Sequence, residues 1–201
     1  MQIAERQVAA EHHFGLRQTG TSIHVDKDTI FEVASMTKPI AAYAALKLVE
    51  QGKLDLDKPL NSYLPEPYLA NEPLHGRITA RMVLTHTGGF PNWRNDKPLH
   101  VHHEPGTAFL YSGEGFVFLQ RVIEQITGLD YEAFMQQTLL RPLSMHDSSH
   151  VWQEQFTQTA AAGHDDSGRP KTNRKLYARP NAAFSLYCTP RDYAAFVLEM
   201  M

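Results

Sequence analysis

The spacing of hydrophobic residues predicts a chain with several helices. From 115 to 126 apolar residues recur every three or four positions, which is typical of an amphipathic helix, and Gly128 then ends it. An alanine-rich stretch over 40–50, stopped by Gly52, predicts a second helix that other elements can approach closely. Shorter helices over 80–85, 131–139 and 191–200 are each predicted to begin at a capping residue: Thr79, Asp130 and Thr189.

Strand signals are confined to the first part of the chain. Residues 8–33 mix short extended runs with turn signals, and the last of these runs covers 29–33. We expect a strand or hairpin here that leads directly into the alanine-rich helix.

Composition limits the classes of function. The chain has 201 residues, enough for one large domain or two small ones, with 42% hydrophobic and 20% charged residues. A net charge of −3 with interspersed signs argues against a nucleic-acid partner. No apolar run reaches the roughly 20 residues that a membrane span needs. Cys188 is the single cysteine, so no internal disulfide can form, and we expect it to be a small buried hydrophobe.

Ser35 and Lys38 lie where the extended segment gives way to the helix. A lysine three positions after a serine lies on the same helix face, one turn away. A serine hydroxyl is a poor nucleophile until a base takes its proton, and unpaired N–H groups at a helix start favour an anion beside it. Taken alone, the pair is a weak signal that a helix-opening serine and a solvated lysine explain better, so its context must decide.

Seven further stretches follow the segment around Ser35 in a defined order. They are 50–59, 78–89, 104–107, 111–113, 115–128, 141–145 and 181–186. With the S-x-x-K sequence of Ser35 and Lys38, they resemble the serine β-lactamase/penicillin-binding-protein superfamily. The similarity is to its class C β-lactamase, D-alanyl-D-alanine carboxypeptidase and esterase branch, from about Phe14 onward.

The resemblance implies an α+β fold of the β-lactamase/transpeptidase type. An antiparallel sheet flanked by helices would stand beside a mainly helical region. We expect one incomplete domain over 1–201, with part of the sheet and the nucleophile helix in 1–52. The mainly helical region would cover 53–180, and 181–201 would return towards the sheet.

The resemblance also implies roles for three side chains. Ser35 would attack a carbonyl group, while Lys38 and Tyr111, the tyrosine of the family's Y-x-N motif, would share the movement of its proton. Unperturbed tyrosine and lysine side chains have pKa values of about 10, so neither is a base at neutral pH. A neighbouring cation favours tyrosinate, and such a pair titrates as a unit.

The second motif departs from the family pattern. Ser112 and Gly113 complete Tyr111-Ser-Gly, so glycine stands where the family has an asparagine that contacts the lysine and the substrate amide. We therefore expect ester hydrolysis rather than β-lactam hydrolysis. Glu114 is either a substitute for that contact or a solvated acid at a helix start. All three residues, Ser112, Gly113 and Glu114, are predicted to bind substrate.

The third family motif, K-T-G or H-x-G, does not follow Tyr111. His86-Thr87-Gly88 has the letters, but it matches a different family segment that supports the helical region. The resemblance implies that the missing strand supplies one oxyanion-binding N–H, the other being that of Ser35. We therefore expect a fragment whose missing segment comes from the rest of a parent protein.

Two sets of residues allow alternative interpretations. His100, His102, His103 and Glu104 suit zinc, but without a second ligand cluster a polar loop is the preferred interpretation, so no metal site is predicted. Four aromatic residues could either line a cleft or pack in the core: Trp93, Trp152, Tyr177 and Phe184.

Serine acyl transfer needs no cofactor, and we expect none. The predicted function is a serine hydrolase that forms an acyl-enzyme at Ser35 with a small ester, amide, β-lactam or D-amino-acid peptide. The alternative is a catalytically impaired penicillin-binding or sensing domain that binds its ligand or becomes acylated without turnover. The resemblance favours a location outside the cytoplasm.

Overall fold

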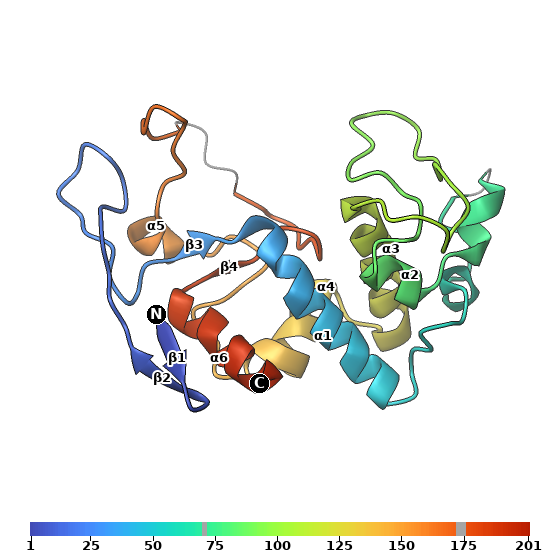
Figure 1. The fold of residues 1–201 in the computed structure, drawn as a ribbon, viewed down its shortest axis with the longest axis horizontal. Coiled ribbons are helices and arrows are strands. Elements are labelled where there is room, and N and C mark those ends of the chain that lie inside the picture. The colour runs from blue at the N-terminus through green and yellow to red at the C-terminus, as the bar shows by residue number, and fades with distance from the viewer. Residues whose placement is uncertain (70–71, 172–175) are drawn as a thin grey trace. The chain divides into compact units, whose positions relative to one another are not determined.

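The computed structural model describes residues 1–69, 72–171 and 176–201. It divides into two compact units. The first unit consists of Met1–Ala34, Met135–Pro180 and Ser185–Met201, and the second of Ser35–Phe134 with Asn181–Phe184. Figure 1 labels the helices and strands of both.

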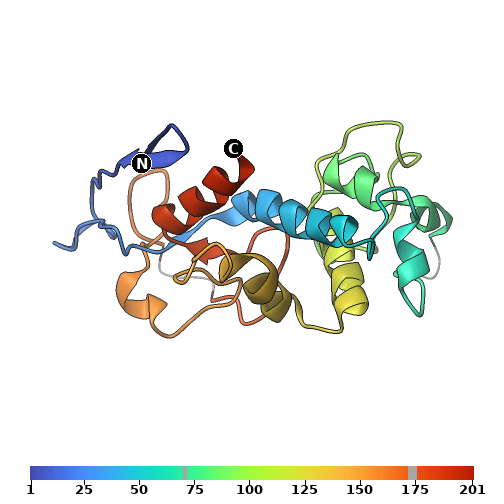
Figure 2. The same cartoon turned by 90° about the horizontal axis from the view of Figure 1, so that it is seen from below.

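Two long helices dominate the second unit. Helices α1 (Thr37–Glu50) and α3 (Gly113–Thr127) are in contact and lie side by side in Figures 1 and 2. The small side chains of Ala41, Ala44 and Ala45 on α1 are buried, which permits the close approach that the alanine-rich sequence predicted.

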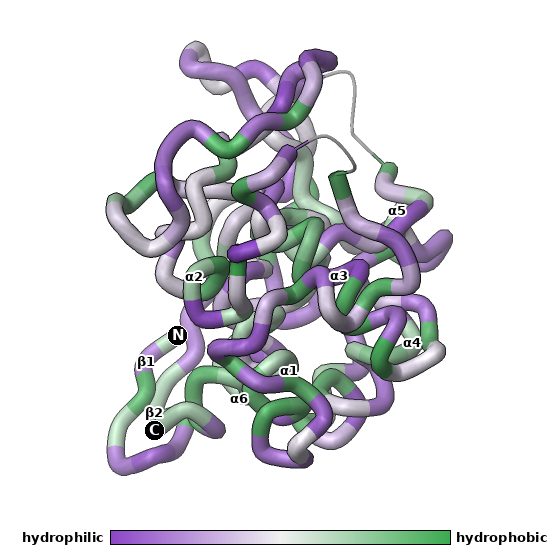
Figure 3. The backbone as a smooth tube through the Cα atoms, turned by 90° about the vertical axis from the view of Figure 1, so that its right-hand side faces the viewer, coloured by the Kyte–Doolittle hydropathy of each residue, from purple (hydrophilic) through white to green (hydrophobic). Residues whose placement is uncertain are grey.

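The ends of α3 follow from its sequence. Ser112 caps its start, because the hydroxyl oxygen accepts a hydrogen bond from the N–H of Gly115 at 2.8 Å. Gly128 ends it with a φ of +68°, a left-handed conformation that glycine adopts without steric cost. The predicted helix is confirmed and begins two residues earlier than expected. Hydrophobic and hydrophilic segments alternate along it, as Figure 3 shows.

Short helices complete the second unit. Helix α2 (Ala80–Leu84) begins at Thr79, whose hydroxyl accepts from the N–H of Met82 at 3.3 Å, as predicted. Three 3₁₀ turns are Ala34–Met36, which leads into α1, Leu60–Tyr63 and Pro73–Arg77. The largest fully buried side chains of this unit include Ile40, Leu48, Leu54, Leu60, Ile78, Phe90, Phe118, Leu119 and Ile123.

The described strands of the first unit form two antiparallel pairs. Strand β1 (Gln2–Ala4) pairs with β2 (Gln7–Ala10), and β3 (Phe31–Glu32) pairs with β4 (Tyr187–Cys188). The predicted extended run at 29–33 thus contains a strand, but one of only two residues. Before it, Leu16 and His24 form an isolated antiparallel bridge.

Helix α6 (Pro190–Met200) begins at Thr189, whose hydroxyl accepts from the N–H of Asp192 at 3.1 Å, as predicted. The remaining helices are α4 (Tyr131–Met135), which continues as a π-helical turn over Gln136–Leu140, and α5 (Phe156–Thr159). The single predicted helix over 131–139 is therefore two kinds of helix in succession.

An aromatic cluster forms the core beside β3 and β4. Ile30, Phe156 and Tyr187 are buried, and Trp152 and Tyr177 pack against them. Trp152 and Tyr177, for which the sequence allowed either a cleft or the core, therefore pack in the core. Cys188 is 1% exposed, which confirms the expected small buried residue. Across the described ranges no helix has the length and apolar character that crossing a membrane requires.

Candidate active site

Ser35 and Lys38 lie on consecutive turns at the start of α1 and contact each other. The Lys38 Nζ donates hydrogen bonds to the Ser35 Oγ at 3.1 Å and to the carbonyl oxygen of Ala183 at 2.9 Å. Ser35 is exposed, whereas Lys38 is only 4% exposed. A buried ammonium group that is held by two acceptors therefore stands behind an accessible hydroxyl.

Tyr111 belongs to the same cluster. The Lys38 Nζ lies 4.8 Å from the centroid of its ring, and the residue is 38% exposed. Burial raises the pKa of Tyr111, but hydrogen bonds with Lys38 and Ser35 and the charge of Lys38 outweigh it, so the pKa is lowered from 10.0. The structure thus brings the three predicted catalytic side chains together.

His86 also lies beside Tyr111, with ring centroids 4.5 Å apart. Burial, together with the charge of Lys38, lowers the pKa of His86 from 6.5. The sequence predicts that His86 supports the helical region and gives no indication of this position beside Tyr111. Its spacing of 25 residues from Tyr111, within irregular backbone, gave no signal of contact.

Ser112 and Glu114 are engaged within the protein. The Ser112 hydroxyl donates to the carbonyl oxygen of Pro91 at 2.9 Å while it caps α3. Glu114 is only 5% exposed. Its carboxylate forms an ion pair with Arg94, in which Arg94 Nη2 lies 2.7 Å from Glu114 Oε2. The substrate-binding roles of Ser112 and Glu114 remain predictions, and the structure gives both side chains structural partners.

Gly113 is packed directly against Trp93. A Cβ atom at position 113 would lie 2.6 Å from the Trp93 Cζ2, so the indole ring occupies the space that a side chain would need. Trp93 also makes an edge-to-face contact with Phe184, with centroids 5.3 Å apart. Phe184 follows Ala183, whose carbonyl binds Lys38. The aromatic pair Trp93–Phe184 therefore flanks the predicted site.

The histidine-rich segment makes local contacts. His100 Nδ1 lies 3.5 Å from a carboxylate oxygen of Glu72, and His103 Nδ1 lies 3.2 Å from the carbonyl oxygen of Glu104. Outside the undescribed positions 70–71 and 172–175, no three histidine, cysteine or acidic side chains converge as a metal site would require.

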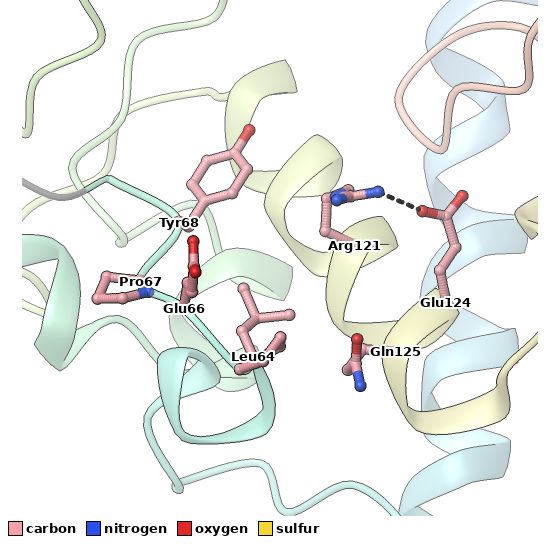
Figure 4. A pocket seen from close by; sticks show the side chains of 8 residues that line it. Leu64, Glu66, Pro67, Tyr68, Arg121, Glu124 and Gln125 are labelled. Carbon is pink, nitrogen blue, oxygen red and sulfur yellow. Dashed lines mark ion pairs between the residues drawn. The ribbon is translucent and has the colours of Figure 1, made fainter.

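A hollow of about 580 Å³ lies in the second unit. Figure 4 shows Tyr68 and the ion pair between Arg121 and Glu124 among its lining side chains. Ser35, Lys38 and Tyr111 are not among its described lining residues, which are Leu64, Pro65, Glu66, Pro67, Tyr68, Arg121, Glu124 and Gln125. The hollow is therefore separate from the serine cluster.

Comparisons with known proteins find relatives in sequence and in fold. A penicillin-binding protein homologue from Pyrococcus abyssi, described as octameric, matches with a TM-score of 0.81 and 25% identity over 98% of this chain and 50% of that one. A class C β-lactamase solved in complex with cefoxitin matches with a TM-score of 0.80 and 26% identity, over 92% of this chain and 54% of that one. Protein flp of Staphylococcus aureus (strain MRSA252) is 25% identical over 198 residues, 90% of this chain and 38% of that protein.

The chain thus spans about two fifths of that curated relative and about half of the matching structures. Its fold is of the β-lactamase/penicillin-binding-protein type, which confirms the fold expected from the sequence. The family model described as Beta-lactamase matches residues 3–201. By this match over nearly its whole length, the chain belongs to the Beta-lactamase family.

Proposed function

We propose that the chain carries the nucleophilic centre of a serine hydrolase that forms an acyl-enzyme at Ser35. Membership of the Beta-lactamase family supports a serine-hydrolase function in general. The observation that carries the specific proposal is the contact between Lys38 Nζ and Ser35 Oγ at 3.1 Å, with the centroid of the Tyr111 ring 4.8 Å from the same Nζ. The nucleophile, a cation and a phenol thus lie in one cluster, and activation of a serine needs such neighbouring groups.

In the proposed reaction Tyr111 in its phenolate form is the base. Ser35 Oγ attacks the carbonyl carbon of the ester, and its proton passes to the phenolate oxygen. The ammonium group of Lys38 stabilises that phenolate, in agreement with the lowered pKa of Tyr111. As the bond to the leaving oxygen breaks, Tyr111 returns the proton to the leaving alcohol, and an ester remains on Ser35. Attack by water then releases the acid and regenerates Ser35.

The substrate that we propose is a small ester with an apolar acyl group. Gly113 has no side chain to bind an amide group, and Trp93 fills the adjacent space. The aromatic pair Trp93–Phe184 offers an apolar surface instead, since both rings are only half-buried. A simple ester carries no amide group that needs a hydrogen-bond partner, so it loses less at such a site than a substrate that carries one.

A second candidate function is a binding or sensing domain that becomes acylated but is not deacylated. Gly113 supports this candidate too, because the missing side chain removes a polar group that could orient the substrate or the hydrolytic water. Both candidates require an acyl-enzyme at Ser35, and they differ only in the step that follows.

Burst kinetics separate the two candidates. The chain is mixed with p-nitrophenyl butyrate or with nitrocefin, and the release of chromophore is followed alongside the intact mass of the protein. A hydrolase gives steady turnover after the burst, whereas a sensing domain gives one equivalent of product and a lasting adduct. The S35A variant is the control and should give neither. Equal signals from S35A and the wild type would refute both candidates.

A further inference from the structure

Tyr111 is held by groups outside its own segment. Residues 101–112 form neither helix nor strand, so no regular hydrogen-bond ladder fixes the tyrosine. Its ring must nevertheless stay beside Ser35 and Lys38 for proton transfer, and small displacements of a reacting group are costly. The contacts on either side of Tyr111 therefore determine whether the site works.

Besides an edge contact between its ring and that of Phe109, with centroids 5.8 Å apart, His86 makes three contacts with this short segment. Its carbonyl oxygen accepts from the N–H of Leu110 at 2.8 Å, and its ring Nδ1 accepts from the N–H of Ser112 at 3.1 Å. Its ring also packs on the Tyr111 ring at 4.5 Å. The residues before and after the tyrosine, and the tyrosine itself, are thus all bound by one histidine.

The backbone of His86 adopts an uncommon conformation to do this. Its φ is +57°, in the left-handed region where residues other than glycine are rare. Strained residues of this kind persist where surrounding contacts over-determine them, and they cluster at functional sites. Here the observed contacts are those with Leu110, Tyr111 and Ser112.

The hydrogen bond from Ser112 requires a neutral imidazole. Because Nδ1 accepts a proton, the ring carries its single hydrogen on Nε2. A second proton on Nδ1 would break this bond and place a cation near Lys38 of α1. Among the described residues, the ionisable groups that face His86 are Lys38 and Tyr111. On α3 the ring of His86 contacts Phe116, which is uncharged.

We propose that His86 is a positioning residue that holds Tyr111 within reach of Ser35 and Lys38, and that it does so only in its neutral form. The catalytic consequence rests on the proposed function. The positioning itself does not, because it can be measured on Tyr111 directly.

Two variants isolate the Nδ1 contact. H86G and H86N both tolerate a positive φ, but only asparagine places an acceptor, its Oδ1, where Nδ1 stands in histidine. The Tyr111 hydroxyl is titrated by NMR in protein labelled with ¹³Cζ-tyrosine, and Y111F assigns the signal. In parallel, the rate of Ser35 acylation is measured against pH.

In H86G we expect the pKa of Tyr111 to move up towards its ordinary value, because the ring leaves Lys38, and acylation to slow by about 10- to 100-fold. H86N should keep the wild-type titration of Tyr111 and most of the rate. Below pH 6.5 its rate relative to that of the wild type should increase as the pH falls, because the wild type alone loses the positioning of Tyr111 towards the lowered pKa of His86.

A folded H86G with the wild-type Tyr111 titration and acylation rate would overturn the proposal. If H86G does not fold, H86N decides alone, and a ratio of the H86N rate to the wild-type rate that stays constant below pH 6.5 would then overturn the proposal. If the wild type shows no Ser35 adduct at all, the proposed function fails, while the Tyr111 titrations of H86G and H86N still test the positioning.

Discussion

The reactivity of Tyr111 depends on the cation beside it. Lys38 Nζ lies 4.8 Å from the ring centroid, and hydrogen bonding with Lys38 and Ser35 lowers the pKa of the phenol against the effect of burial. K38M removes the cation, so we expect Ser35 acylation to slow by about 100- to 10,000-fold, the usual contribution of a positioned acid–base group. In Y111F we expect Ser35 acylation to slow by a factor in the same range. Intact-mass kinetics with an activated ester measure both variants.

Lys47 provides a matched control on the same helix. It is a partly exposed lysine that pairs with Glu50, and it makes no recorded contact with Ser35 or Tyr111. K47M should acylate at the wild-type rate. A K47M defect as large as that of K38M would show that the loss is general rather than local to the site.

The pH dependence of acylation has a defined direction. Because the folded pKa of Tyr111 is below 10.0, the phenolate forms and the rate rises at a lower pH than for an ordinary tyrosine. In K38M the rise should move to higher pH, since the cation that favours the phenolate is gone. A rise at the same pH in both proteins would contradict the proposed role of Lys38.

Position 113 is predicted to tolerate no side chain. G113A places its Cβ atom 2.6 Å from the Trp93 Cζ2, so the indole must move, and we expect a loss of about 1–3 kcal/mol in the free energy of unfolding. Urea denaturation gives this value. The control is G76A, because a Cβ atom at Gly76 meets no heavy atom within 4 Å. Equal stability of G113A and G76A would show that Trp93 does not fill this space.

The elements were largely predictable where their signals are local. Thr79, Thr189 and Gly128 mark helix ends that the structure confirms, because a cap or a left-handed glycine acts on its own turn. The extent of β3 was not predictable, since the length of a strand depends on a partner that lies about 155 residues away along the chain. The π-helical turn after α4 likewise had no sequence signal.

The residues of the candidate site likewise divide into those that local spacing predicts and those that it does not. Lys38 lies on the first turn of α1 and Ser35 in the 3₁₀ turn directly before it, so their contact follows from local spacing. Tyr111 could be placed only through the family resemblance. Ala183 contributes a backbone carbonyl, which no side-chain pattern reveals, and His86 reaches Tyr111 through a loop.

The start of α3 depends on the ion pair between Glu114 and Arg94. The carboxylate is 5% exposed and also accepts from the backbone N–H of Arg94 at 3.1 Å. R94L leaves this buried acid without its guanidinium partner, and we expect a loss of about 1–3 kcal/mol because the arginine is itself partly exposed. The double variant R94L/E114Q should recover part of the loss in urea denaturation.

The R94L experiment also tests the predicted substrate role of Glu114. If Glu114 acts on substrate, R94L will raise KM strongly with little change in stability. If the pair is structural, as its burial favours, stability will fall and KM will change little.

At the scale of the whole molecule, Cys188 reports on opening of the first unit. The thiol is 1% exposed in β4, and burial raises the pKa of Cys188, so the folded protein holds almost no reactive thiolate. We expect labelling by iodoacetamide to be slow in native conditions and to rise in step with unfolding as urea is added. Rapid labelling without denaturant would show that β3 and β4 separate while the protein remains folded.

The central claim is that folding makes one hydroxyl, that of Ser35, reactive towards an acyl group. The most direct measurement is peptide mapping by mass spectrometry after brief exposure to p-nitrophenyl butyrate. We predict a butyryl group on the peptide that contains Ser35, abundant in the wild type and scarce in Y111F. Butyryl groups spread over surface residues, or equally abundant at Ser35 in the wild type and Y111F, would contradict the account.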